Sequence, residues 1–244
     1  MTDGRSAILT YHSLDNSGSV ISTAPEIFRR QLESLAGSGI PLVPVDRVAS
    51  CPGSIAVTFD DGYSNLAEHA FPILDSLQIP ATVFVVSRYC GQFNRWPSQS
   101  PGVVPELPLL SWEQLADVPS RVNIGAHTAT HPRLPALSAE ECDREMYECQ
   151  DEIEQKLARP VRWFAYPYGS CSTSVCSTAA RHFELAVGTS LGFVSPVASV
   201  MNLPRLDMYY FRHRPSLDRV FSPMMRVYIG VRNLAREARQ HASD

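Results

Sequence analysis

The sequence predicts an α/β protein built around a parallel sheet. Short apolar segments alternate with segments of helical periodicity along most of the 244 residues, a pattern typical of strands joined by crossover helices. The run Ala-Thr-Val-Phe-Val-Val at residues 81–86 is the kind of strand that is buried on both faces of such a sheet. Three polar clusters each follow a predicted strand, which is where α/β proteins bind ligands.

The predicted elements follow in order along the chain. Strands are expected at residues 7–11, 54–59, 81–86, 122–126, 161–165, 185–188 and 203–206. Helices are expected at residues 25–37, 64–77, directly after Ser111, at 138–157 and from 217 to about 240. Pro72 must kink or divide the second helix. Ser111 with Gln114, and Ser138 with Glu141, form capping boxes that begin the third and fourth helices.

Residues 88–110 interrupt this alternation. They are rich in Pro, Gly, Ser and Gln and contain Trp96, so we expect a long loop. Loops of this length in a compact domain are usually functional or disordered. The chain shows no internal repeat and no clear interdomain linker, and its length suits a single barrel domain.

Charge and composition argue against several classes of protein. The 21 basic and 25 acidic residues give a net charge of −4, which argues against a general nucleic-acid-binding protein. No apolar run approaches the roughly 18 residues of a membrane span, and the N-terminus has no secretory apolar region. We therefore expect a cytoplasmic protein without an integral membrane segment.

The six cysteines include no CxxC pair, so we expect six reduced thiols. Cys142 and Cys149 lie seven residues apart and are expected on one side of a helix. Cys171 and Cys176 closely follow the third polar cluster, and a secondary role for them stays open.

The first cluster closes a predicted strand with two adjacent carboxylates, in Thr58-Phe59-Asp60-Asp61-Gly62. Neighbouring side chains on a strand diverge, so one carboxylate can bind a cation while the other receives a proton. The alternative is an ordinary Asp-Gly turn with solvated acids.

The second cluster, His127-Thr128-Ala129-Thr130-His131, places two imidazoles four residues apart. On a helical turn this spacing brings both side chains to one face, where they can bind one divalent ion. Alone, the pattern equally fits two surface or core histidines. With an acidic strand end it becomes two histidines and one carboxylate, which leaves coordination positions for water and substrate.

The third cluster is Tyr166-Pro167-Tyr168-Gly169. A strand that ends in this way can turn a backbone N–H toward a ligand, or it can be a turn with packed aromatic side chains. Together, the three clusters resemble, in order and spacing, the three motifs of the polysaccharide deacetylases (carbohydrate esterase family 4). The resemblance runs from about residue 8 to residue 205.

The resemblance implies a single-domain deformed (β/α) barrel with about seven strands. It implies that Asp61, His127 and His131 are metal ligands and that Asp60 is the general base. It also implies that the backbone N–H of Tyr168 contributes to an oxyanion hole. Zn²⁺ is the default ion, and Co²⁺, Ni²⁺ or Fe²⁺ suit similar ligands.

Two departures from the family pattern concern the remaining site residues. Ala165 stands where the third motif usually has arginine, and the usual C-terminal Leu-x-His, source of the general acid, is missing. However, Leu9-Thr10-Tyr11-His12 resembles the permuted arrangement of poly-N-acetylglucosamine-type deacetylases, which makes His12 the acid. Arg205 is our candidate to replace the arginine and to contact substrate. A packed strand-end histidine is the alternative for His12.

The expected function is metal-dependent removal of acetyl groups from an N- or O-acetylated carbohydrate. Trp96 and Tyr166 are expected to contact the sugar, although Trp96 is equally a core or lid residue. The alternatives are another C–N hydrolase on the same fold (a deformylase, imidase or amidase) and a non-catalytic carbohydrate-binding relative.

We expect residues 1–215 to form the catalytic domain and residues 216–244 a helical extension. The extension mixes apolar residues with arginines at 219, 226, 232, 236 and 239. A covering helix with a solvated basic face is the favoured interpretation, and contact with an anionic membrane is the alternative.

Overall fold

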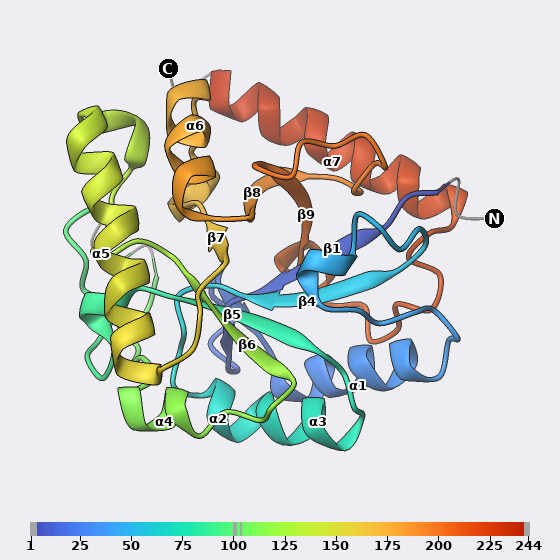
Figure 1. Ribbon diagram of the computed structural model, residues 1–244. Coiled ribbons are helices and arrows are strands. Elements are labelled where there is room, and N and C mark those ends of the chain that lie inside the picture. Colours follow the sequence, from blue (N-terminus) through green and yellow to red (C-terminus); the bar gives the residue numbers. More distant parts are fainter. Residues whose placement is uncertain (1–3, 100–101, 103, 242–244) are drawn as a thin grey trace.

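The computed structural model describes residues 4–99, 102 and 104–241, with side chains described as far as Leu234. Its centre is a closed barrel of seven strands (Figure 1). In spatial order these are β1 (Ala7–Tyr11), β4 (Ile55–Phe59), β5 (Ala81–Val85), β6 (Val122–Ala126), β7 (Trp163–Ala165), β8 (Leu185–Leu191) and β9 (Leu203–Asp207). This confirms the single-domain deformed (β/α) barrel with about seven strands. A small separate sheet pairs β2 (Ser13–Leu14) with β3 (Ser22–Thr23).

Helices surround the barrel (Figure 1). They are α1 (Pro25–Ala36), α2 (Leu66–His69), α3 (Phe71–Ser76), α4 (Trp112–Ala116), α5 (Ala139–Leu157), α6 (Thr173–His182) and α7 (Pro223–His241). Pro72 lies in the first turn of α3, so the predicted second helix is indeed divided. Both predicted capping boxes are present, at the start of α4 and of α5. The described residues between 88 and 110 form the expected loop, whose beginning overlaps the 3₁₀ turn η2 (Ser87–Tyr89).

Strand β1 closes the barrel. It pairs with β4 from Ala7↔Ile55 to Tyr11↔Phe59, and with β9 at Leu9↔Leu206 and Thr10↔Asp207. All pairs in the barrel are parallel, so the carboxyl ends of the seven strands open on the same end. The register between β8 and β9 shifts between Val187 and Leu191.

Two buried clusters stabilise this arrangement. One contains alternate strand residues such as Ile8, Ala56, Phe84 and Ala165 and fills the barrel. The other contains the intervening strand residues and the inner faces of the helices. Gly125 on β6 faces the ring of Phe84, and a Cβ at this position would collide with that ring.

Helix α7 runs across the outside of the barrel, near β8 and β9 (Figure 1). Met225 and Ile229 are buried in the outer core cluster, so one face covers the barrel as predicted. The opposite face differs from the prediction of a solvated basic face, because it exposes Met224, Val227 and Val231. Within the described residues, no helix is long and apolar enough to cross a membrane. The domain boundary at residue 216 stays a prediction.

The expectation of six reduced thiols is wrong for one pair. Cys171 and Cys176 form a disulfide across the start of α6, with Cα atoms 6.2 Å apart, a separation that a disulfide can span. The other four cysteines are free. Cys142 and Cys149 are both buried on α5, as their spacing predicted.

Candidate active site

The three polar clusters meet at the carboxyl end of the barrel. They line one hollow of about 270 Å³, because β4, β6 and β7 are parallel and end on the same side. Its walls include His12, Asp60, Asp61, Tyr63, Trp96, Ser98, His127, His131, Arg133 and Tyr168. The structure therefore brings together seven of the nine site residues predicted from the sequence, all except Tyr166 and Arg205.

Asp61, His127 and His131 form a compact, buried group of potential metal ligands. Asp61 Oδ1 lies 3.4 Å from Nε2 of His127 and 3.4 Å from Nε2 of His131. One ligand atom from each residue lies within 4.8 Å of the other two. Atoms so placed can share one divalent ion, since each ligand bond spans about 2 Å.

The surroundings of these residues fit a metal ion. His127 Nδ1 lies 2.8 Å from the carbonyl oxygen of Ala165, and a proton donated there leaves the lone pair of Nε2 facing Asp61. Burial opposes ionisation of Asp61, but the two adjacent imidazoles hold its pKa well below its ordinary value. Burial lowers the pKa of His131, which favours the neutral imidazole that a metal requires. One carboxylate and two imidazoles suit Zn²⁺ and similar ions.

The predicted helical turn between the two histidines is wrong. Thr128 has φ 69° and His131 has φ 61°, so the segment is a loop that twice enters the left-handed region. The Thr128 hydroxyl accepts a hydrogen bond from the His131 N–H at 2.9 Å, and Glu145 on α5 accepts hydrogen bonds from Thr130. These bonds, rather than helical periodicity, bring both imidazoles to Asp61.

Asp60 forms a buried ion pair with Arg205 of β9. Arg205 donates from Nη1 to Oδ1 at 2.8 Å and from Nη2 to Oδ2 at 2.6 Å, and it also donates from Nε to the carbonyl oxygen of Gly188 at 2.7 Å. Burial alone would raise the pKa of Asp60, but the guanidinium overcomes this and holds the pKa below its usual range. The Arg205 side chain is only 1% exposed. We therefore assign it to Asp60 rather than to substrate contact.

His12 follows β1 and faces the same carboxylate. Its Nε2 lies 3.9 Å from Asp60 Oδ2, and its half-buried side chain lines the hollow. Asp60 is thus flanked by Arg205 on one side and His12 on the other. His12 therefore borders both this carboxylate and the hollow.

Aromatic side chains form the wall around His131. The Trp96 indole lies against its imidazole with ring centroids 4.4 Å apart, and the Tyr168 ring meets it at 4.7 Å. Trp96, from the long loop, therefore lines the hollow, and its contact with a sugar stays a prediction. Tyr166 does not, because its buried hydroxyl donates to the carbonyl oxygen of Met201 at 2.8 Å.

Arg133 and Ser98 are two of the lining residues that were not predicted from the sequence. Arg133 places its guanidinium 4.2 Å from the centroid of the Tyr168 ring. The Ser98 hydroxyl lies 2.9 Å from the Tyr168 hydroxyl and donates to the His131 carbonyl oxygen at 2.5 Å. Arg133 stands two residues after His131, and this proximity is the one sequence signal that could have indicated it.

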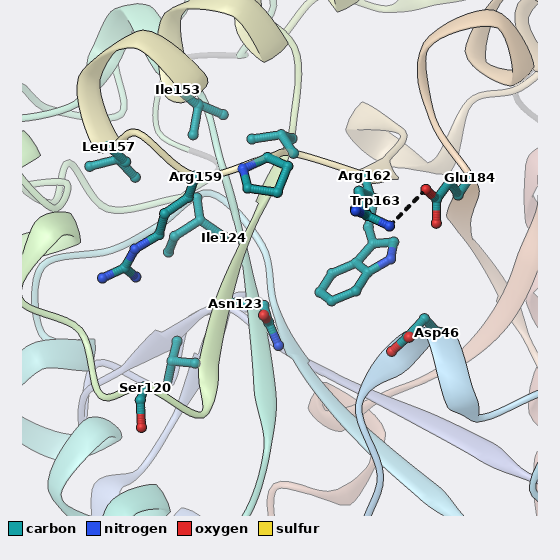
Figure 2. Close-up of a pocket in the computed structure, with 13 residues that line it drawn as sticks. Asp46, Ser120, Asn123, Ile124, Ile153, Leu157, Arg159, Arg162, Trp163 and Glu184 are labelled. Atoms are coloured by element: carbon teal, nitrogen blue, oxygen red, sulfur yellow. Dashed lines mark hydrogen bonds and ion pairs between the residues drawn. The ribbon is translucent and has the colours of Figure 1, made fainter.

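A larger hollow, of about 470 Å³, lies at the opposite end of the barrel. Figure 2 shows its lining, in which the Trp163 indole lies between Asn123 and Asp46 while Arg162 pairs with Glu184. It contains none of the predicted site residues. The smaller hollow at the carboxyl ends is therefore the candidate active site.

The fold and this site define a single-domain (β/α)-barrel protein with a potential Asp–His–His metal centre at the carboxyl ends of its strands. A comparison with protein-family models agrees with this class. The model described as polysaccharide deacetylase matches residues 47–185, more than half of the chain. The chain therefore belongs to the polysaccharide deacetylase family.

Several solved structures share the fold, and several curated proteins are similar in sequence. Among solved structures, IcaB from Ammonifex degensii superposes with a TM-score of 0.70 and 22% identity, over 87% of this chain and 97% of that one. The Streptococcus pyogenes deacetylase PplD, solved in complex with acetate, superposes with a TM-score of 0.70 and 22% identity, over 83% of this chain and 92% of that one. Among curated proteins, a chitooligosaccharide deacetylase from Sinorhizobium fredii is 27% identical over 151 residues, 60% of this chain and 61% of that protein. YxkH of Bacillus subtilis is 22% identical over 77% of this chain and 66% of that protein, so the chain spans about two thirds of these curated relatives or less.

Proposed function

We propose that this protein is a metal-dependent deacetylase that removes acetyl groups from an N-acetylated carbohydrate. One observation carries the proposal: an Asp–His–His group, a second carboxylate and a histidine line the same hollow. These are the groups that hydrolysis of an acetamide requires, and the family to which the chain belongs agrees with them.

Asp61, His127 and His131 would hold the ion, with Zn²⁺ as the default and Co²⁺, Ni²⁺ or Fe²⁺ as compatible alternatives. A divalent ion bound there would polarise the acetyl carbonyl and lower the pKa of water. The three side chains are buried, which limits competition from solvent. The hydrogen bond of His127 to the Ala165 carbonyl fixes the ring orientation that ligation needs.

Asp60 would accept the proton of the attacking water. A carboxylate can do this only when it is ionised and held in place, and Arg205 supplies both conditions through two parallel hydrogen bonds. In this role Arg205 is a positioning residue. It takes the place of the arginine that the third motif lacks, from a different strand.

His12 would protonate the departing amine, a general-acid step worth about 10²–10⁴-fold in rate. The backbone N–H of Tyr168 would stabilise the developing oxyanion, and one such donor is typically worth about 3 kcal/mol of barrier. Tyr168 has φ 58°, a turn at the end of β7 that directs its backbone away from the strand. Trp96 and Arg133, which also line the hollow, would contact the sugar.

Acetate release tests the reaction itself. Purified protein would be incubated with acetylated sugars, oligosaccharides and sugar nucleotides, with and without a chelator. We expect acetate release that stops on chelation and returns with Zn²⁺, and that is lost in Asp60→Asn while metal remains bound. Exposed Asp117, replaced by Asn, is the matched control. Release of formate or ammonia instead would identify another C–N hydrolase and contradict the proposal.

Two further variants test the assigned roles. His131→Ala should abolish stoichiometric metal binding, and a tight ion retained by this variant would remove His131 from the ligand set. His12→Ala should slow acetamide substrates more than activated esters, because an alkoxide or alcohol leaves with less help. Equal losses on both substrates would contradict a leaving-group acid.

A further inference from the structure

The outer face of α7 carries a stripe of exposed apolar side chains. Met224, Val227, Val231 and Leu234 are 81%, 67%, 61% and 67% exposed. Their spacing of three, four and three residues places them along one side of the helix. Met225 and Ile229 point the other way, into the core, so the stripe has no function in holding α7 on the barrel. Contiguous exposed apolar residues of this kind mark interaction surfaces.

Positive charge is concentrated in the stretch of sequence that contains this stripe. Residues 212–239 contain seven arginines and two acidic residues, a net charge of +5 in a chain whose total is −4. Arg232 is exposed beside the stripe, with its guanidinium 5.6 and 5.3 Å from the ring centroids of Tyr210 and Tyr228. The apolar stripe and the positive charge together therefore favour a partner that is both apolar and anionic.

A groove at the start of α7 joins the two features. It has a volume of about 460 Å³ and is lined by Arg214, Arg219, Met224 and Tyr228, among others. Arg219 is 88% exposed, with Asp218 at 4.0 Å, and the Arg214 guanidinium lies 4.9 Å over the Tyr228 ring. The groove thus places arginine and apolar side chains next to the N-terminus of the 19-residue helix α7, which carries a partial positive charge.

We propose that α7 and this groove dock the protein on the surface of a membrane that contains anionic phospholipids. The apolar stripe would enter the boundary between headgroups and acyl chains, and the arginines would contact lipid phosphates. A second copy of this chain is the less suitable occupant, because two α7 helices would bring their net positive charges together. The proposal does not depend on the proposed enzymatic activity.

Co-sedimentation with vesicles tests the proposal on the full chain. We expect binding to vesicles of phosphatidylcholine with about 30 mol% phosphatidylglycerol, weak binding to phosphatidylcholine alone, and loss of binding as salt rises. Val227→Ser with Val231→Ser should weaken binding about tenfold or more, and Arg219→Gln should weaken it about fivefold. Val197→Ser is the matched apolar control, since Val197 is 91% exposed outside α7, and Arg162→Gln is the matched charge control.

A spectroscopic measurement separates insertion from loss of folding. Val231→Trp should show a blue-shifted emission component when anionic vesicles are added, relative to the parent chain, and Val197→Trp should not. Equal binding to neutral and anionic vesicles would overturn the anionic specificity. Absence of vesicle binding would overturn the proposal. The proposal would also be overturned if the chain does not bind vesicles and sedimentation velocity shows a concentration-dependent dimer that the two serine substitutions abolish.

Discussion

Removal of the Arg205 guanidinium is the sharpest test of how the site is held together. In Arg205→Met, Asp60 would keep its burial, at 4% side-chain exposure, and lose both charge-assisted hydrogen bonds. An uncompensated buried charge typically costs about 3–5 kcal/mol of stability. For a domain of this size, about 2–4 °C of melting temperature accompanies each kcal/mol, so the expected fall is roughly 6–20 °C.

The effect has a definite pH dependence. In the parent protein the pKa of Asp60 lies below its usual value, so ionised Asp60 contributes stability above its unfolded pKa, and this is lost as pH falls through the folded pKa. Without Arg205, burial dominates and raises the pKa of Asp60, which favours the protonated form. The deficit of Arg205→Met should therefore be largest near neutral pH and shrink below about pH 4. Urea unfolding in chelator, across pH, would measure it.

Two comparisons decide whether the buried pair is responsible. Arg162→Gln removes an arginine from an exposed pair with Glu184 at 3.2 Å, and exposed pairs contribute about 1 kcal/mol or less. Asp60→Asn with Arg205→Met should be less destabilised than the sum of its single variants. The reasoning fails if Arg205→Met loses no more stability than Arg162→Gln, or if the double variant is strictly additive.

Three further predictions concern the backbone, a helix start and a thiol. Gly169→Ala should be destabilised and lose activity, because Gly169 has φ 67° and a Cβ there would collide with Thr189; a melting temperature like that of the parent would contradict this. Ser138→Ala removes the capping side chain of α5 and should cost about 1 kcal/mol in urea unfolding; an unchanged midpoint would contradict it. Burial raises the pKa of Cys149 to about 12, so native protein at pH 8 should be alkylated at Cys51 and spared at Cys149, as mass spectrometry would show; equal labelling would refute the burial.

Sequence reasoning succeeded where structure is determined locally. Apolar runs located all seven barrel strands, and the serine capping boxes located the starts of α4 and α5. The meeting of the three polar clusters followed from one topological rule, that parallel strands end on the same side. Asp61, His127 and His131 could be brought together on that basis without knowledge of their side-chain directions.

The errors concern features that depend on contacts distant in sequence or on single backbone angles. Thr128 is β-branched and adopts φ 69°, a conformation that such residues rarely take, so a helical turn was the natural but wrong expectation. Tyr166 belongs to the third motif, yet its hydroxyl is directed to Met201, 35 residues away. No local pattern indicates that the outer face of α7 is apolar, because its apolar residues could equally have faced the core.

Closure of the barrel links the fold to the proposed chemistry. β1 lies between β4 and β9, so these three strands bring together the proposed acid His12, which follows β1, the proposed base Asp60, which follows β4, and the proposed positioning residue Arg205, which lies within β9. Thr58 ties the three strands together inside the barrel, since its hydroxyl donates to the Leu9 carbonyl oxygen at 2.8 Å and accepts from Arg205 Nη1 at 3.3 Å. Of the potential metal ligands, Asp61 follows β4, and His127 and His131 lie in the loop after β6. Their arrangement does not depend on the pairing of β1 with β9. Substitutions that weaken the pairing of β1 with β9 should therefore abolish proton transfer while metal binding persists.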